Sequence, residues 1–111
     1  MTLVDTSVWV DHFRRGNFRL QQMLEEGTVA THPMIIGELA CGNLFQRPAT
    51  LGLLGRLPSI SQVPDRLVFQ AIESRHLWGR GIGWIDAHLL AASLVSGTSL
   101  WTLDARLARL V

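Results

Sequence analysis

The sequence has 111 residues, of which 48% are hydrophobic and only 17% are charged, whereas roughly 25% charged residues is usual in a soluble domain. This balance excludes intrinsic disorder, because the chain has enough apolar surface to offset the entropy lost on ordering, and the length suits one domain over residues 1–111. A net charge of +1 excludes both a strongly basic protein that coats nucleic acid and a strongly acidic tail.

Short apolar or alternating runs predict strands, and longer helical patterns separate them. Strands are expected at residues 2–4, 28–31, 59–63 and 99–102. Helices are expected at residues 7–15, 18–26, 33–45, 47–57, 64–78, 84–95 and 104–110. Strands that alternate with helices favour right-handed crossovers and a parallel sheet. We therefore predict an α/β fold, a three-layer α/β/α domain with a small parallel sheet of about four strands.

The single cysteine, Cys41, excludes an internal disulfide and most thiolate metal sites. Such cysteine usage fits a reducing compartment. Asp5 interrupts the region where a signal peptide needs its apolar run, and turn residues break the longest uncharged stretch, residues 87–103. We therefore expect a cytoplasmic protein without a membrane segment.

Three aspartates stand beside predicted helix starts. Asp5 and Asp104 follow predicted strands, and ligands of open α/β sheets bind beyond the carboxyl ends of the strands. Aspartate is also a preferred residue for capping a helix, so capping explains each of these two residues equally well. Asp86 lies in the first turn of its helix, where the helix dipole attracts a carboxylate. Its helical face continues through Leu90 and Ser93, which favours an inward direction.

Glu38 is harder to explain by structure alone. Its neighbours at helical spacing, Met34, Cys41, Gly42 and Phe45, carry no positive charge, and no arginine lies within eight residues on either side. A solvated glutamate usually shares its helix face with a cationic partner. Burial of an unpaired carboxylate is costly, so the sequence favours a functional role over a structural one.

Four carboxylates at one sheet edge repel each other unless a cation lies among them. Oxygen ligands without a histidine or cysteine pattern favour Mg²⁺ or Mn²⁺ over zinc. Such a site suits phosphodiester hydrolysis, because a divalent ion activates water and neutralises charge in the transition state. The four histidines show no metal-ligand spacing and are interpreted as surface or hydrogen-bonded residues. Asp11, beside His12, receives no catalytic role.

Four segments carry these acids in a fixed order. They are Leu3–Asp11, Gly37–Gly42, Gly83–Ala92 and Leu100–Asp104. Together they resemble the motifs of the PIN-domain ribonucleases, in particular the VapC-like toxins of bacterial toxin–antitoxin modules. The order and spacing match over nearly the whole chain. One departure is that the family usually has a fifth short strand after the last motif, whereas this sequence ends seven residues after Asp104.

The resemblance implies a Mg²⁺- or Mn²⁺-dependent endoribonuclease in which Asp5, Glu38, Asp86 and Asp104 form an acidic quartet. Asp5 and Asp86 are expected to contact the metal directly. Asp104 is expected to be a further ligand or to act through water. Glu38 is expected to orient the attacking water or to act as the base.

Two hydroxyls and three arginines complete the expected site. Thr6 and Thr102 are expected to hydrogen-bond the carboxylates. Arg14, Arg15 and Arg19 form the only dense basic cluster. This cluster is either a solvated helix end or a contact for the RNA backbone.

The resemblance also implies an RNA substrate, a cognate antitoxin protein that keeps the enzyme inactive, and a homodimer. A catalytically inert PIN-like interaction module and a nuclease for other single-stranded nucleic acid remain alternatives, although retention of all four acids disfavours the inert module. A phosphoacceptor receiver domain needs a lysine near its last strand, and the chain has none. Phosphatases of the haloacid-dehalogenase type need a second aspartate where the chain has Ser7.

Overall fold

Three short parallel strands form the centre of the structure, a computed structural model that describes residues 1–111. The strands are β1 (Thr2–Val4), β2 (Val29–Ala30) and β3 (Ser99–Trp101). β1 lies between the other two, and Leu3 is in register with Ala30 on one side and Leu100 on the other. Leu3 and Val4 are fully buried, as expected for the central strand of a parallel sheet that helices cover.

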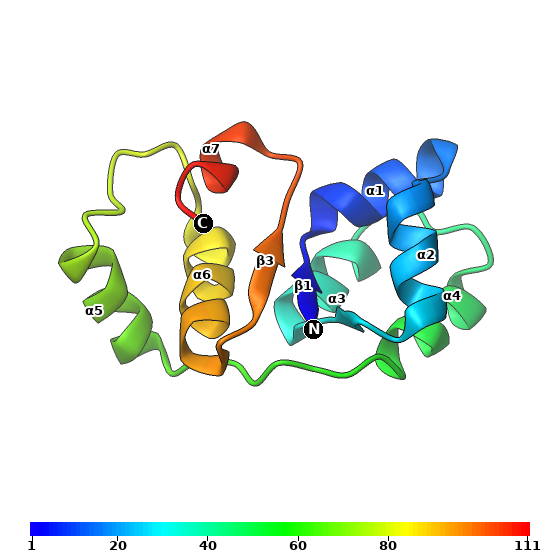
Figure 1. The fold of residues 1–111 in the computed structure, drawn as a ribbon, viewed down its shortest axis with the longest axis horizontal. Coiled ribbons are helices and arrows are strands. Elements are labelled where there is room, and N and C mark those ends of the chain that lie inside the picture. The colour runs from blue at the N-terminus through cyan, green and yellow to red at the C-terminus, as the bar shows by residue number, and fades with distance from the viewer.

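Seven helices flank these strands. They are α1 (Thr6–Arg15), α2 (Phe18–Glu26), α3 (Pro33–Ala40), α4 (Arg47–Gly55), α5 (Asp65–Ser74), α6 (Trp84–Ser96) and α7 (Ala105–Ala108). α5 and α6 lie on the β3 side of the molecule, and α1 to α4 lie on the opposite side (Figure 1). The strands therefore have helices on both sides, as the predicted α/β/α arrangement requires. None of the helices is long and apolar enough to span a membrane.

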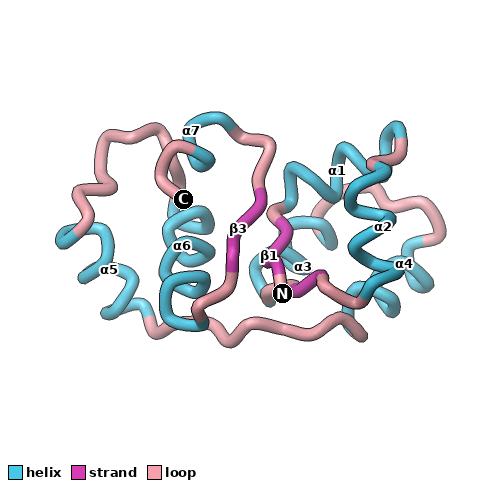
Figure 2. Tube along the Cα trace, viewed as in Figure 1, coloured by secondary structure: helices cyan, strands magenta, loops and turns pink.

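The sheet has three strands where about four were expected. Of the predicted strand at residues 59–63, only Ser59 pairs, through an isolated parallel bridge to Thr31. Two backbone hydrogen bonds of 2.8 Å hold this bridge, from Thr31 to Pro58 and from Ile60 to Thr31. Beyond the bridge the chain continues as the long loop that connects α4 to α5 (Figure 2). Only Val63 in this segment is buried, so little apolar surface ties the segment to the sheet.

Four predicted helices are shorter than expected: those expected at residues 47–57 and 104–110 end two residues early, at Gly55 and Ala108, and two others end earlier still. The helix expected to reach residue 45 ends at Ala40, and the Arg47 guanidinium donates hydrogen bonds to the carbonyl groups of Ala40 and Gly42. Those bonds satisfy carbonyl groups that would otherwise stay unpaired at a helix end. The helix expected to reach residue 78 ends at Ser74, because His76 adopts a φ of 54°, outside the helical range.

The hydrophobic core has a main cluster and a smaller satellite. The main cluster joins the strands to residues of the flanking helices, including the fully buried Leu20, Ile35 and Leu89. The satellite lies between α5 and α6 and is built on the small Ala87, Ala91 and Ala92 of α6, together with Val63 and Val68. Small side chains on α6 allow α5 to approach closely. The packing fixes α6, and with it the helix turn that carries Asp86.

Candidate active site

Asp5 lies where β1 ends and α1 begins. Its carboxylate atom Oδ2 accepts hydrogen bonds of 2.7 Å from both the Ser7 and the Thr102 hydroxyls, and its backbone N–H donates to the Trp101 carbonyl oxygen at 2.9 Å. Asp5 is 6% exposed and caps the N-terminus of α1. The capping interpretation is therefore correct, and the cap also fixes the carboxylate at the sheet edge.

Asp104 caps the short helix α7 beyond the end of β3. Its Oδ1 accepts hydrogen bonds from the backbone N–H groups of Arg106 at 2.8 Å and Leu107 at 3.2 Å. Its own N–H donates to the Thr102 hydroxyl at 3.0 Å. The Thr102 hydroxyl therefore links Asp5 to the backbone of Asp104 at the carboxyl edge of the sheet.

Asp86 stands in the first turn of α6, where its Oδ2 accepts a hydrogen bond of 3.1 Å from the Gly83 N–H. Burial raises the pKa of the Asp86 carboxyl, and the negative charges of Asp5 and Asp104 raise it further, against the lowering effect of the Gly83 hydrogen bond. Asp86 therefore lies within electrostatic reach of the other two aspartates, and the three carboxylates repel one another.

Glu38 joins this edge from the last turns of α3. Its Oε1 accepts a hydrogen bond of 2.8 Å from the hydroxyl of Thr6, the residue next to Asp5. Burial of an unpaired Glu38 would be costly, but the side chain is exposed, because α3 ends two residues later and the chain continues as a loop. A hydroxyl rather than an arginine orients this carboxylate.

Each of these four carboxylates uses a single oxygen in hydrogen bonds to the protein. The engaged atoms are Asp5 Oδ2, Glu38 Oε1, Asp86 Oδ2 and Asp104 Oδ1. The second oxygen of each carboxylate accepts no hydrogen bond from the protein. One oxygen thus positions the group, and the other stays available to a ligand.

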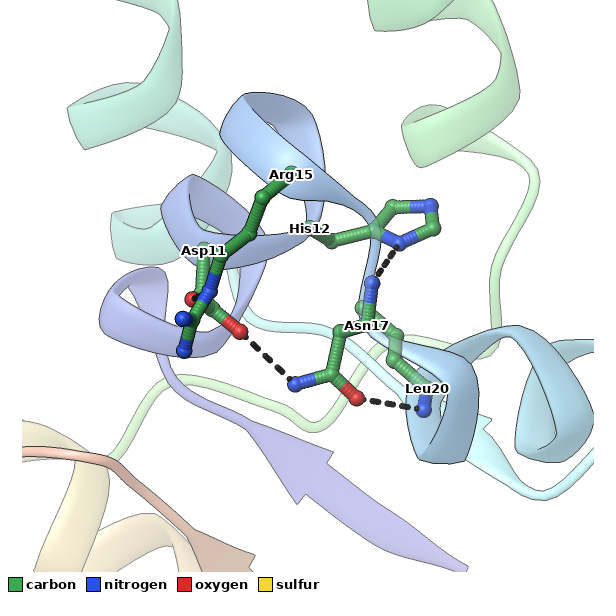
Figure 3. A network of polar contacts seen from close by, with 5 residues as sticks. All are labelled: Asp11, His12, Arg15, Asn17 and Leu20. Carbon is green, nitrogen blue, oxygen red and sulfur yellow. Dashed lines mark hydrogen bonds and ion pairs between the residues drawn. The ribbon is translucent and has the colours of Figure 1, made fainter.

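Asp11 shows the opposite arrangement. Its Oδ1 accepts from Arg15 at 2.6 Å and its Oδ2 accepts from the Asn17 side chain at 3.0 Å. Asn17 in turn receives the Leu20 N–H and donates its own N–H to His12 Nδ1 (Figure 3). The hydrogen bonds from Asn17 and Arg15 lower the pKa of the Asp11 carboxyl. Asp11 therefore holds the junction of α1 and α2, and both of its oxygens are engaged, unlike those of the four carboxylates above.

The quartet has the donor chemistry of a divalent cation site but not yet its geometry. Side chains of His, Cys, Asp and Glu form no group of three or more that could hold a metal ion as they lie. Shared coordination by the quartet therefore stays a prediction. Four free carboxylate oxygens and the mutual repulsion at Asp86 fit an oxygen-preferring cation such as Mg²⁺ or Mn²⁺.

The structure separates the three arginines of the basic cluster. Arg15 pairs with Asp11, and the Arg19 guanidinium lies 4.5 Å from the centre of the Trp101 ring in a cation–π contact. Arg14 has no hydrogen bond or ion pair to another side chain and lines a groove that also contains Glu38. Of the three arginines, Arg14 is thus the one with a free guanidinium.

Sequence reasoning missed several residues near this edge. Ser7 supports Asp5, and its position two residues after a capping aspartate was a signal that could have identified it. Arg106 covers the loop before α6, with Nη1 at 3.5 Å from the Gly81 carbonyl oxygen. No local pattern indicates that contact, because 25 positions separate the two residues.

One histidine, His88, contradicts the expectation that all four lie at the surface or are hydrogen-bonded. His32 and His88 are fully buried. His32 Nδ1 accepts the Met34 N–H at 3.0 Å, but its Nε2 has no partner. His88 Nε2 lies 3.2 Å from Asp65 Oδ1 but is not aligned for a hydrogen bond. Burial, followed by the effect of His88, lowers the pKa of His32.

Comparisons with known proteins agree with this description. The sequence matches the PIN domain family over residues 2–111. It is 44% identical over 108 residues to Ribonuclease VapC32 of Mycobacterium tuberculosis strains CDC 1551 / Oshkosh and ATCC 25618 / H37Rv. The matched stretch covers 96% of this chain and 87% of the relative in both cases.

Proposed function

The chain belongs to the PIN-domain family and is an endoribonuclease of the VapC type, and we propose that its acidic quartet performs the reaction with a divalent metal ion. The relatives are named ribonucleases, and 44% identity over 96% of the chain supports the same class of reaction here. The observation that carries the site is the free oxygen on each of Asp5, Glu38, Asp86 and Asp104. The catalytically inert alternative is not favoured, since an inert module does not need four carboxylates with a free oxygen.

The ion that fits this donor set is Mg²⁺ or Mn²⁺. The chemistry it supplies when bound is activation of water for attack on the phosphodiester and neutralisation of charge on the phosphate oxygens. Asp5 and Asp86 are the proposed direct ligands, through the oxygens that the protein leaves free. Asp104 is a further ligand or acts through water. Burial raises the pKa of Asp86 most, and a cation here would relieve the further rise that the charges of Asp5 and Asp104 cause.

Glu38 orients the attacking water or accepts its proton. Its exposure to solvent gives water access to the carboxylate, and the bond from Thr6 holds Oε1 in place. Thr102 has the corresponding function for Asp5, because its hydroxyl fixes Oδ2 and leaves Oδ1 free. These hydroxyls reduce the reorganisation that a ligand would otherwise impose on the carboxylates.

The proposed partners follow from the family and from the surface. Substrate RNA, a cognate antitoxin protein and a second copy of the chain are the partners, and the cytoplasm is the proposed location of a single domain over residues 1–111. Large apolar side chains that are more than half exposed support protein contacts. They include Leu53, Phe69 and Val95. Free arginines such as Arg14 support contact with the RNA backbone.

Cleavage of a labelled single-stranded RNA tests the proposal. Purified protein should cut the RNA with Mg²⁺ or Mn²⁺, and EDTA should stop the reaction. Asp5→Asn should abolish cleavage and leave the fold intact, whereas Asp11→Asn, which changes an acid of the structural network, should retain it. Equal cleavage by Asp5→Asn and wild type would rule out the assigned site. A single-stranded DNA of the same sequence tests the alternative substrate in parallel.

A further inference from the structure

A groove of about 710 Å³ opens directly beside Glu38. One wall comes from α1 and includes Val10, Phe13 and Arg14, and the other comes from the loop at residues 41–46. Thr6 and Glu38, which are hydrogen-bonded to each other, also line it. The groove is therefore continuous with the proposed active site, and its volume lies within the range of roughly 300–1,000 Å³ that small-molecule sites occupy.

The loop at residues 41–46 presents an aromatic ring to solvent at this groove. Phe45 lines the groove and is 87% exposed, the largest fraction among the exposed large apolar side chains. Exposure of an entire phenyl ring gives up the stabilisation that its burial would provide. The exposure therefore needs an explanation other than folding.

The exposed ring sits on a braced backbone. The Arg47 guanidinium bonds the carbonyl groups of Ala40 and Gly42, and the Thr50 hydroxyl donates to the Phe45 carbonyl oxygen at 2.8 Å. Contacts on both sides of the loop thus hold its backbone while the Phe45 ring stays uncovered. Because the backbone is held, only the side-chain rotation of Phe45 has to be ordered when a flat ligand stacks on the ring.

The groove contains polar groups that a nucleotide can use. Arg14 brings a guanidinium without a protein partner, and Asn43 brings an amide that can both donate and accept hydrogen bonds. Only five of the twelve lining residues are hydrophobic. An exposed aromatic ring beside a free cation is the combination that binds single-stranded nucleic acid, through base stacking and phosphate contact.

We propose that this groove binds a nucleotide of single-stranded RNA next to the scissile phosphodiester, with the base stacked on Phe45 and a backbone phosphate at Arg14. The inference rests on the proposed ribonuclease function, since the strand must continue from the groove to Glu38. It assigns these two residues to substrate binding rather than to the chemical step.

Binding of a fluorescent single-stranded RNA, measured by anisotropy in EDTA, tests the groove without catalysis. In the Asp5→Asn background, Phe45→Ala should weaken binding about tenfold and Phe45→Trp should retain it, because stacking depends on an aromatic face. Arg14→Gln should weaken binding and reduce the slope of log affinity against log salt concentration by the amount expected for about one phosphate contact. Phe18→Ala, which removes a ring that is 78% exposed outside the groove, is the matched control and should bind like the parent.

Steady-state cleavage separates this inference from the proposed function. With Asp5 intact, Phe45→Ala should raise KM about tenfold with little change in kcat. Absence of cleavage by the wild type would contradict the proposed function. The wild type could be active while the RNA affinity and KM of Phe45→Ala and Arg14→Gln lie within twofold of the values for Phe18→Ala. That result would overturn the groove proposal alone. Unchanged RNA binding together with lost inhibition by the cognate antitoxin would assign the groove to a protein partner and likewise overturn it.

Discussion

The hydroxyl of Thr102 donates a 2.7 Å hydrogen bond to Asp5 Oδ2 across 97 positions of the sequence. The same hydroxyl oxygen accepts the Asp104 N–H at 3.0 Å and lies 3.2 Å from the Ser7 hydroxyl. One side chain at the end of β3 thus couples the carboxylate after β1 to the helix start after β3. The parallel pairing of β1 with β3 makes this possible, because it brings the carboxyl ends of both strands to one edge.

Replacement of that hydroxyl should weaken the site more than the fold. Thr102→Val keeps the side-chain shape but removes the donor to Asp5, and we expect a stability loss of about 1 kcal/mol. The metal concentration needed for half-maximal cleavage should rise about 10- to 100-fold, because the partners of metal ligands have effects of this size. Thr102→Ser should restore both properties. Thr98→Val, at the opposite end of β3, is the control, and an equal metal requirement in both valine variants would contradict the assigned role.

Removal of the Asp86 charge should stabilise the metal-free protein. Its pKa is raised, so the folded state binds the Asp86 proton more tightly than the unfolded state does, and ionisation at neutral pH costs stability. Asp86→Asn should therefore raise Tm at pH 7 in EDTA while lowering cleavage by at least about a hundredfold. Added Mg²⁺ should raise the Tm of the wild type but not of the variant. Glu73→Gln, an exposed change on α5, should alter neither Tm nor cleavage. A lower Tm for Asp86→Asn would contradict the claim that the ionised Asp86 destabilises the metal-free protein.

Local sequence patterns predicted the parts of the molecule that depend on neighbours in the chain. Asp5 and Asp104 cap helices directly after strands, and a capping residue acts on backbone groups two or three positions away. The α2 and α6 helices end at Gly27 and Gly97, which both adopt left-handed conformations. These features need no knowledge of the rest of the fold, so the sequence could define them.

Features that depend on distant contacts were not predictable in the same way. The exposure of Glu38 follows from the end of α3 at Ala40, which Arg47 stabilises from the next helix. The expected strand at residues 59–63 has the alternating sequence pattern of a strand, but only its first residue pairs, with Thr31. The Arg19 contact with Trp101 joins α2 to β3. Periodicity describes which face a residue prefers, but the tertiary partner decides whether that preference is met.

The loop before α6 offers a test of close packing around Gly81. Gly79 and Gly81 have φ values of 71° and 80°, so alanine is strained at both positions by about 1 kcal/mol. A Cβ at Gly79 would meet no atom within 4 Å, whereas at Gly81 it would lie 2.6 Å from the Arg106 Cδ. Gly81→Ala should therefore destabilise the protein more than Gly79→Ala does in urea unfolding. In an Arg106→Ala background, Gly81→Ala should cost no more stability than Gly79→Ala does in the wild type. A larger loss of stability in that background would mean that the contact with Arg106 is not the cause.

Buried His32 should make folding stability depend on pH. Burial, with the effect of His88, lowers its pKa below the ordinary value of 6.5, and a protonated ring could no longer accept the Met34 N–H at the start of α3. This contribution to stability is fully present above pH 6.5 and is lost as the pH falls below that value toward the folded-state pKa, because the unfolded chain binds the proton first.

His32→Asn keeps a side chain that caps helices well but does not titrate, so it isolates this effect. Urea midpoints between pH 5 and pH 8 should fall for the wild type as the pH decreases and should fall less steeply for His32→Asn. The comparison concerns slopes, because the smaller asparagine also leaves a cavity that lowers stability at every pH. His76→Asn, a change at an exposed position with a φ of 54° that asparagine tolerates, should keep the slope of the wild type. Parallel curves for His32→Asn and wild type would show that this imidazole does not control the acid sensitivity of the fold.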